Sequence, residues 1–371
     1  MSIMYVDFDR FHRETIDFLA SIAPGEPNSP TKLSKNPFPF PKVWWKFWGK
    51  WDKGRIWSVC KYSALWYSKD IFKDTIEKYW INEDGSPKKF TNIGTNKISR
   101  EDKHIAIGVN DYTNARILVF TNSLEQIYFE DTPLCRVLCY DEKIKAWPVL
   151  AATAAIPLIF SSVDIFEDGG ACGDGALVPY LPSSYLKEEA QTVQIAISCS
   201  DLDLPRLNSY EGKGKYRWEG VTNLIESLAY SFLIAAAHKD MEAFYEAGNS
   251  YYYQFEYSEI HPKMNPISFD LLNKKLIVKA YNIGLKRGRQ AVRNMTEKDK
   301  KQAKEYGITL ALSGGGTLFP AMYGMIAGIA EEAYKLKDPT TKTNTPARVK
   351  AMIGGSGGAL AAAYMVEHLP V

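Results

Sequence analysis

The stretch from Ile308 to Val371 places the strongest constraint on the fold, because it contains two strand-to-helix turns in succession. In each turn, a short apolar run that favours a β-strand meets a glycine cluster, and small residues with helical spacing follow. The first turn carries Gly314-Gly315-Gly316, and the second carries Gly354-Gly355-Ser356-Gly357-Gly358. The end of the chain is therefore predicted to form two consecutive β–α units.

The second turn fits the pattern Gly-x-Ser-x-Gly, in which a serine lies on a tight strand-to-helix turn that only glycine-like neighbours can approach closely. The hydroxyl of Ser356 would then stand at a helix N-terminus, which favours developing negative charge. A plain structural turn is the alternative interpretation of this serine.

The triple glycine offers successive backbone N–H groups that can converge on an oxyanion. A tight connection between a strand and a helix, or a phosphate loop, would use the same residues. The phosphate interpretation fails, because neither glycine cluster is followed by Gly-Lys-Ser/Thr and neither completes Gly-x-Gly-x-x-Gly.

Composition limits the class of protein. The chain has 371 residues with 46% hydrophobic content, which suffices for a sizeable core, and its net charge of +2 argues against nucleic acid as a partner. Its five cysteines show no Cys-x-x-Cys spacing and are expected to be reduced. The sequence opens with no secretory pattern, and its longest uncharged run, 146–163, is interrupted by Pro148 and Pro157. We therefore expect a cytoplasmic protein with peripheral membrane contact at most.

Apolar runs that favour strands alternate with helical patterns along the chain. These runs lie at 104–109, 116–120, 193–197, 251–255, 308–312 and 349–353. Since they are continuously apolar instead of alternating, they predict one α/β domain over 1–371, with a mostly parallel sheet and helices on both faces.

Residues 25–60 have the most unusual composition. After a proline-rich connection, five tryptophans are interleaved with five basic residues. Indole rings and lysines together suit the membrane–water interface, so this segment is predicted to be a lid or membrane contact. The contacting residues would be Trp44, Trp45, Trp48 and Trp51. An aromatic-rich cap folded onto the core is the alternative.

A serine nucleophile needs a base, and the acidic candidates are better than the histidines. The histidines are His12, His104, His238, His261 and His368. His368 follows Ser356 by twelve residues on one predicted helix, roughly 18 Å away, and the other four lack a glycine-rich or loop-end context. Asp174 precedes Gly175 in a turn of small residues, where a carboxylate can act as the base directly. Asp168, which also precedes glycines, is its rival.

The glycine triplet, Gly354-x-Ser356-x-Gly358 and Asp174-Gly175-Ala176 resemble the three motifs of the patatin-like phospholipases, which are acyl hydrolases with a Ser/Asp dyad. The similarity extends to 152–165, 193–198 and 251–292. The resemblance favours Asp174 over Asp168, because the downstream Leu177, Val178 and Pro182 match the family spacing.

The resemblance implies a three-layer α/β fold in which Ser356 is the nucleophile and Asp174 the base. The N–H groups of Gly315, Gly316 and Gly357 would stabilise the oxyanion, and Gly314 would shape that loop. No metal or cofactor is implied by this chemistry, and the substrate would be a membrane lipid or lysolipid.

The order of the motifs departs from the family, in which the glycine motif and the serine precede the aspartate. Circular permutation accounts for this order, with 293–307 as a linker joining the family's usual C-terminal and N-terminal ends. It predicts that Met1 and Val371 lie close together. A second departure is Thr317-Leu318-Phe319-Pro320, which stands where the family usually has Arg or Lys soon after the triple glycine.

The leading hypothesis is a lipid acyl hydrolase of the phospholipase A or lysophospholipase type. The alternatives are a catalytically weak or inactive membrane-binding protein that keeps the fold, and an α/β-hydrolase with a remote histidine. The sequence leaves open the head group, the acyl chain and the oligomeric state.

Overall fold

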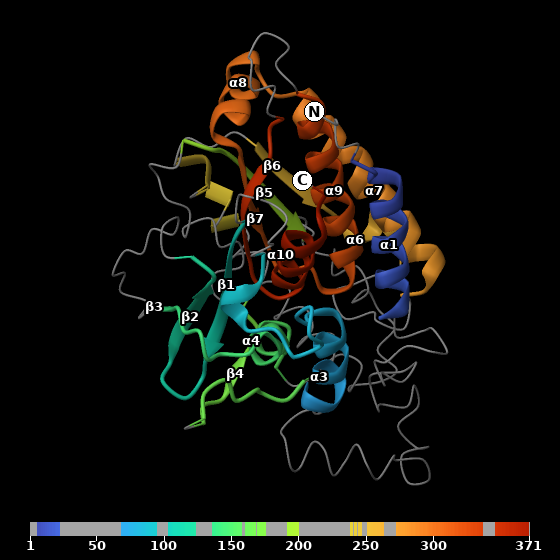
Figure 1. Cartoon of the computed structure of the whole chain (residues 1–371). Helices are drawn as coiled ribbons and strands as arrows, with labels where there is room; N and C mark the ends of the chain where they lie inside the picture. Colours follow the sequence, from blue (N-terminus) through green and yellow to red (C-terminus); the bar gives the residue numbers. More distant parts are fainter. Residues whose placement is uncertain are drawn as a thin grey trace, which may run out of the picture.

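The computed structural model describes a β-sheet and the helices that lie around it. The described residues are 6–22, 68–94, 103–123, 136–157, 160–167, 169–175, 191–199, 238–239, 241–242, 244–246, 251–262, 272–336 and 346–370. Figure 1 shows these elements in chain order by colour, with helices α7, α9, α10 and α1 gathered on one side of the central strands.

The eight strands form a single mixed sheet in the order β3-β2-β1-β8-β7-β5-β6, with β4 paired to β1. Every neighbouring pair is parallel except β1 with β2 and β1 with β4, so the prediction of a mostly parallel sheet is confirmed. The strands are β1 His104–Asp111, β2 Arg116–Thr121, β3 Arg136–Cys139, β4 Cys172–Gly173, β5 Val193–Cys199, β6 Tyr251–Phe255, β7 Ile308–Leu312 and β8 Val349–Gly354.

Most of the described helices follow the apolar periodicity of the sequence. They are α1 Phe8–Ser21, α3 Ser68–Tyr79, α4 Ala146–Thr153, α6 Tyr257–Ile260, α7 Lys274–Arg293, α8 Glu297–Tyr306, α9 Phe319–Lys335 and α10 Gly357–His368, with 3-10 turns η2 Phe90–Asn92 and η6 Gly316–Leu318. The charged stretch 293–307 contains helix α8, whose first turn is capped by the side chain of Thr296 accepting from the amide of Asp299.

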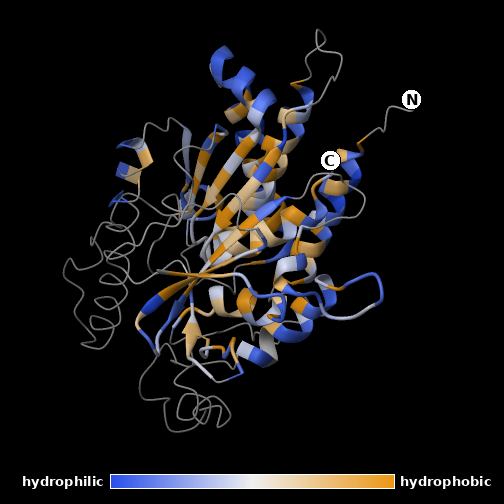
Figure 2. Ribbon diagram, turned by 60° about the vertical axis from the view of Figure 1, so that its left-hand side comes forward, coloured by the Kyte–Doolittle hydropathy of each residue, from blue (hydrophilic) through white to orange (hydrophobic). Residues whose placement is uncertain are grey.

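The sheet separates two sets of apolar side chains, because successive residues of a strand point to opposite faces. Ile105, Ile107 and Val109 of β1 face the large cluster that includes α1, α4, α7, α9 and α10, whereas Ala106 faces a smaller cluster on the other side. The described helical residue in that smaller cluster is Phe244. Figure 2 shows the strands hydrophobic along much of their length and the outer helices hydrophilic on their outward surfaces.

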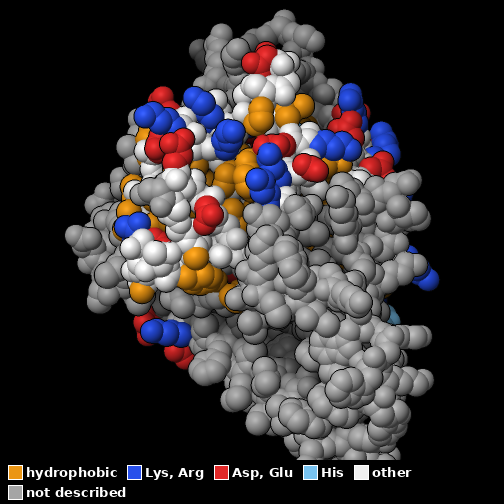
Figure 3. All heavy atoms as spheres, turned by 90° about the horizontal axis from the view of Figure 1, so that it is seen from below, with side chains coloured by type: hydrophobic (Ala, Val, Ile, Leu, Met, Phe, Trp, Pro, Cys, Tyr) orange, Lys and Arg blue, Asp and Glu red, His pale blue; other side chains and the backbone are white. Residues whose placement is uncertain are grey.

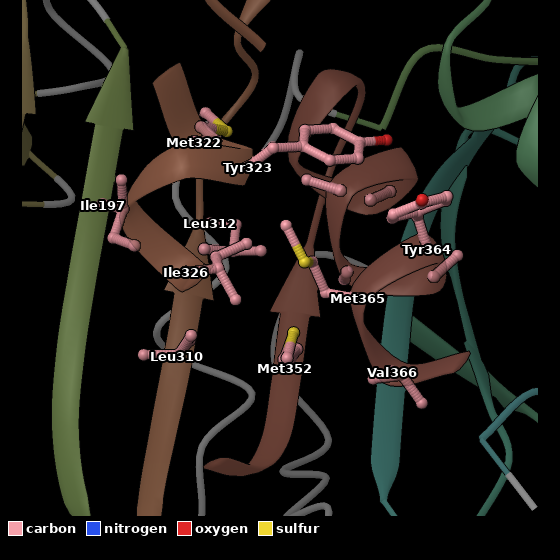
Figure 4. Packing of buried hydrophobic residues seen from close by; sticks show 14 of the residues in the cluster. Ile197, Leu310, Leu312, Met322, Tyr323, Ile326, Met352, Tyr364, Met365 and Val366 are labelled. Atoms are coloured by element: carbon pink, nitrogen blue, oxygen red, sulfur yellow. The ribbon is translucent and has the colours of Figure 1, made fainter. Parts of the chain in front are cut away.

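Helices α9 and α10 cover the strands that lead into the two glycine turns. In Figure 4, Leu310 and Leu312 of β7 and Met352 of β8 lie beneath Ile326 of α9 and Met365 of α10. All five side chains are almost completely buried. The two β–α units predicted at the end of the chain are therefore present and share one core.

Helix α7 lies against α9 at a distance that only glycine permits. A Cβ at Gly284 or Gly288 of α7 would overlap the backbone carbonyls of Ala321 and Met325 of α9. A Cβ at Gly324 of α9 would likewise overlap the backbone of α7. Close backbone approach between helices requires small residues at the contact, so α7 and α9 form a tightly joined pair beside the sheet.

Helix α1 is fixed to this pair by a buried polar network around Glu331 of α9. His12 of α1 bonds the Tyr281 hydroxyl through Nδ1 at 2.8 Å and a Glu331 oxygen through Nε2 at 3.2 Å. Arg289 of α7 and Lys335 of α9 also donate to Glu331, at 2.6 and 2.7 Å. The network joins three helices through one carboxylate.

The first described helix also contacts the last one. The ring of Phe18 in α1 stacks on Tyr364 in α10, with centroids 4.2 Å apart and planes at 13°. Met1 and Val371 themselves, which circular permutation predicts to be adjacent, lie outside the described residues.

Replacement of Glu331 by Gln should lower the free energy of unfolding at pH 7 by about 1–2 kcal/mol, because solvent screens the partly exposed Arg289 and Lys335. Burial disfavours the Glu331 carboxylate, but hydrogen bonds from Lys335, Arg289 and His12 outweigh burial and lower its pKa from 4.5 to about 2. Its stabilising contribution is therefore complete above pH 4.5 and is lost as the pH falls towards 2. Denaturant unfolding at a series of pH values measures this contribution.

Glu297→Gln is the matched control, because its carboxylate is 89% exposed and pairs with Lys300 within α8. An exposed ion pair contributes little, so this variant should unfold at almost the wild-type denaturant concentration. Equal stability of the Glu331→Gln variant and the wild type at pH 7 would contradict the role given to the network.

Candidate active site

The pairing around strand β1 brings two distant segments to one point. Strand β2 occupies one edge of β1 from Ala106 to Asp111. On the other edge, β8 pairs in parallel as far as Ile107, and β4 pairs antiparallel with Asn110 and Asp111. Strands β8 and β4 therefore run towards each other along the same edge, and the residues that follow them converge beside Gly108.

Ser356 follows β8 and caps helix α10 in a backbone conformation that is unfavourable for any residue with a side chain. Its φ is 51° and its ψ is −126°. Such conformations persist where the surroundings enforce them, and they cluster at functional sites. The predicted tight turn with serine at its apex is thus present between β8 and α10.

The glycines on either side of Ser356 are required by close backbone contacts. A Cβ on Gly354 would lie 2.6 Å from the carbonyl carbon of Gly358. A Cβ on Gly358 would overlap the carbonyl oxygen of Ser313, at the end of β7. The two glycines of the Gly-x-Ser-x-Gly pattern are therefore needed because the start of α10 passes close to the ends of β8 and β7.

The hydroxyl of Ser356 donates a hydrogen bond to Asp174 Oδ2 at 2.7 Å, across a sequence separation of 182 residues. Both residues are buried, with exposed fractions of 6% for Ser356 and 3% for Asp174. A short bond between a hydroxyl and a carboxylate in surroundings with little water is electrostatically strong. The structure thus brings together the two residues that the sequence singled out as nucleophile and base.

Two hydrogen bonds and a close approach to β1 hold the turn that carries Asp174. Its amide donates to the carbonyl of Ala155 at 3.1 Å, and its carbonyl accepts from Asn110 Nδ2 at 2.6 Å. A Cβ on Gly175 would overlap the carbonyl oxygen of Gly108. Glycine after the aspartate is therefore needed because the chain crosses β1 at this point.

The triple glycine lies next to the serine turn. The position that a Cβ on Gly357 would occupy is 3.3 Å from the amide nitrogen of Gly315. Within the described part of the chain, the amides of Gly315, Gly316 and Gly357 have no hydrogen-bond acceptor. These three N–H groups are the ones expected to face an oxyanion, and they are available to do so.

Gly314 has a different place in the same loop. Its carbonyl accepts a hydrogen bond from the Ser313 hydroxyl at 2.9 Å, and that hydroxyl in turn accepts from the amide of Cys199 at 2.9 Å. The start of the loop is therefore fixed to the end of β5, as expected for a residue that shapes the loop.

The carbonyl of Gly315 is held from two sides. It accepts from the amide of Leu318 at 2.7 Å and from the hydroxyl of Tyr257 at 3.3 Å. Because the C=O and N–H groups of a trans peptide point in opposite directions, this arrangement directs the Gly316 N–H away from Tyr257. Thr317-Leu318-Phe319-Pro320, in place of a basic residue, belongs to η6 and the first turn of α9.

Several residues of this site were missed in the sequence. Thr153, Asn110 and Tyr257 each hold a part of the turns, yet none belongs to a recognisable motif. The signal for Thr153 was its position as the one hydroxyl residue in the small-residue helix before the aspartate. Asn110 and Tyr257 gave no comparable signal, because their roles depend on contacts between distant segments.

The five histidines are all described, and none bonds the hydroxyl of Ser356, which pairs with Asp174. His12 belongs to the network around Glu331, and His368 lies at the far end of α10 from Ser356. Burial lowers the pKa of both imidazoles.

Other predicted positions lie outside the described residues. They are the rival Asp168, the aromatic residues Trp44, Trp45, Trp48 and Trp51, and the whole of the segment 25–60.

Comparison of the chain with protein-family models, with curated proteins and with solved structures finds no match in any of the three. None of the described helices has the length and apolar character needed to cross a bilayer. The described residues also contain no group of three or more His, Cys, Asp or Glu placed to hold a metal ion.

Replacement of Gly358 by Ala should destabilise the protein by about 1–3 kcal/mol, which is the usual effect of forcing extra volume into a packed site. At an ordinary helix position the same replacement would stabilise the protein, because Ala is favoured over Gly there by about 1 kcal/mol. The reason is that the added methyl group would meet the backbone carbonyls of Ser313 and Leu312, which have little freedom to move. Denaturant unfolding measures whether the free energy of unfolding falls or rises.

Gly315→Ala is the matched control, since a Cβ there first meets the flexible end of Met322 at 3.1 Å. Its loss of stability should be the smaller of the two. A Gly358→Ala variant more stable than the wild type would show that the turn is looser than described.

Proposed function

We propose that this protein is a lipid acyl hydrolase that cleaves carboxylic esters through a Ser356–Asp174 dyad. The observation that carries the proposal is the 2.7 Å hydrogen bond from Ser356 Oγ to Asp174 Oδ2, beside three amides that lack acceptors in the described part of the chain. A nucleophile, a base and oxyanion donors within reach of one another form the set that acyl transfer requires.

The first half of the reaction forms an acyl-enzyme. Ser356 Oγ attacks the ester carbonyl carbon while its proton passes to Asp174 Oδ2. The carbonyl oxygen becomes an oxyanion, which the N–H groups of Gly315, Gly316 and Gly357 stabilise. The tetrahedral intermediate then expels the alcohol, which takes the proton from Asp174 and leaves the acyl group on Ser356.

The second half of the reaction regenerates the enzyme. Asp174, again ionised, accepts a proton from a water molecule, and the oxygen of that water attacks the acyl carbon. The second tetrahedral intermediate collapses with loss of the serine oxygen, which takes back the proton. A free fatty acid leaves, and each proton removed by Asp174 has been returned.

The substrate class rests on the resemblance to patatin-like phospholipases and on the tryptophan- and lysine-rich segment 25–60. Circular permutation belongs to the same proposal. The serine turn lies after the aspartate turn in the chain, and yet the two meet in space. They can do so because the convergence of β8 and β4 on one edge of β1 depends on strand direction and pairing, and not on the order of the motifs. The cytoplasmic location with peripheral membrane contact is likewise proposed.

The second candidate is a membrane-binding protein of the same fold with little or no activity. The residues after the triple glycine favour it, because Thr317-Leu318-Phe319-Pro320 stands where the family usually has a basic residue. The described surface in Figure 3 carries Lys, Arg, Asp and Glu interspersed, which does not by itself favour an anionic membrane. An α/β-hydrolase mechanism is disfavoured, because the Ser356 hydroxyl is bonded to an aspartate.

Replacing Ser356 with Ala should abolish both hydrolysis of a 4-nitrophenyl ester and labelling by a fluorophosphonate probe, without unfolding the protein. Replacing Asp174 with Asn should lower kcat by about 10²–10⁴-fold, which is the usual contribution of a general base. Both rates are compared with those of Ser258→Ala, a change to an exposed serine whose hydroxyl bonds Glu256.

Full turnover in the Ser356→Ala variant would remove this serine from the mechanism. A wild-type protein that neither hydrolyses esters nor reacts with the probe, yet binds phospholipid vesicles, would establish the second candidate instead.

A further inference from the structure

Thr153, the last residue of helix α4, is completely buried between the two turns of the dyad. Its hydroxyl accepts a hydrogen bond from the amide of Ser356 at 3.1 Å and donates one to the carbonyl of Gly108 at 2.8 Å. Its own carbonyl accepts from the amide of Gly175 at 3.1 Å. One residue therefore contacts the serine turn, the aspartate turn and the strand between them.

The directions of these bonds are fixed by the groups involved. A threonine hydroxyl has a single proton, and the Gly108 carbonyl can only accept, so that proton is committed to Gly108. The Ser356 amide can only donate, so its hydrogen bond must be accepted by a lone pair of the Thr153 hydroxyl oxygen. The hydroxyl thus has one geometry in which both neighbours are satisfied.

The contact with Ser356 falls on a strained residue. Because the φ of Ser356 is 51°, its backbone needs surrounding contacts to keep it in place. The amide that Thr153 binds belongs to the peptide immediately before the serine, so this bond limits rotation of the turn. It also means that the Ser356 amide is occupied, and that Gly315, Gly316 and Gly357 are left to face the oxyanion.

We propose that the Thr153 hydroxyl is a positioning residue that sets the distance between Ser356 Oγ and the Asp174 carboxylate. This inference rests on the proposed hydrolase function. The side chain fastens the serine turn to β1 at Gly108, and the main chain of the same residue fastens the aspartate turn at Gly175. Thr153 does not touch the substrate, since its hydroxyl is committed on both sides.

A role in packing alone is the rival explanation, and the two roles predict different effects for variants of similar size. Thr153→Val keeps the shape of the side chain and removes the hydroxyl. Thr153→Ser keeps the hydroxyl and removes the methyl group. If the hydroxyl positions the dyad, the serine variant retains activity and the valine variant loses it, whereas packing would favour the valine variant.

The test measures kcat and KM for hydrolysis of 4-nitrophenyl butyrate by the full chain and the two variants, with thermal unfolding as the check on the fold. Thr309→Val is the matched control, because Thr309 is a buried threonine in β7 whose hydroxyl bonds to that of Thr192. We expect Thr153→Val to lower kcat by about 10–100-fold, the scale of a misplaced reacting group. KM should stay within about twofold in all variants, and Thr153→Ser and Thr309→Val should keep kcat within about threefold of the wild type.

Wild-type kcat in Thr153→Val, or an equal loss in Thr153→Ser, overturns the positioning role while the proposed function stands. If the wild-type protein shows no turnover that is lost on replacement of Ser356, both the positioning role and the proposed function are overturned. If Thr153→Val does not fold, Thr153→Cys is compared with Thr153→Ser, because sulfur at the same position is a weak hydrogen-bonding atom. A cysteine variant as active as the serine variant then overturns the proposal.

Discussion

The approach of two chain segments to the backbone of β1 at Gly108 is the constraint on which the rest of the structure depends. Strand β8 leaves the edge of β1 just before this point, and β4 arrives along the same edge from the opposite direction. Since the chain at Gly175 passes so close to the Gly108 carbonyl that no side chain fits, the aspartate turn has one position available. The hydroxyl of Ser356 and the carboxylate of Asp174 meet because both turns are defined against the same strand.

Contacts between the helices stabilise the positions of the two turns. The glycine contacts between α7 and α9 fix the helix that follows the triple glycine, and the Glu331 network fixes α1 to the same pair. Helix α10, which Ser356 caps, packs on α9, β8 and β1, so the nucleophile is attached to a rigid element. A strained serine can persist in such a setting, because relaxing its backbone would require movement of a packed helix.

Features that leave a local pattern were predictable from the sequence, whereas contacts between residues far apart in the chain were not. Ser356 and the glycines around it were found because a tight turn leaves a local pattern, and the strands were found because buried parallel strands are continuously apolar. Asp174 was found through its Asp-Gly turn and through a resemblance. Thr153, Asn110 and Tyr257 were missed, because each acts on a residue far away in the sequence and a polar residue beside apolar neighbours gives no indication of its partner. The stretch 293–307, predicted as a solvated linker or short helix, contains the capped helix α8, because Thr296 and Asp299 supply a helix start even where apolar residues are few.

The most direct test of the central claim is an experimental structure of the protein after reaction with an alkyl fluorophosphonate. We predict that phosphorus is bonded to Ser356 Oγ, that the phosphonyl oxygen lies within hydrogen-bond distance of the amides of Gly315, Gly316 and Gly357, and that the Asp174 carboxylate lies beside the modified oxygen. Phosphorus on another residue, or an Asp174 carboxylate turned away from Ser356 behind an intact fold, would contradict the account.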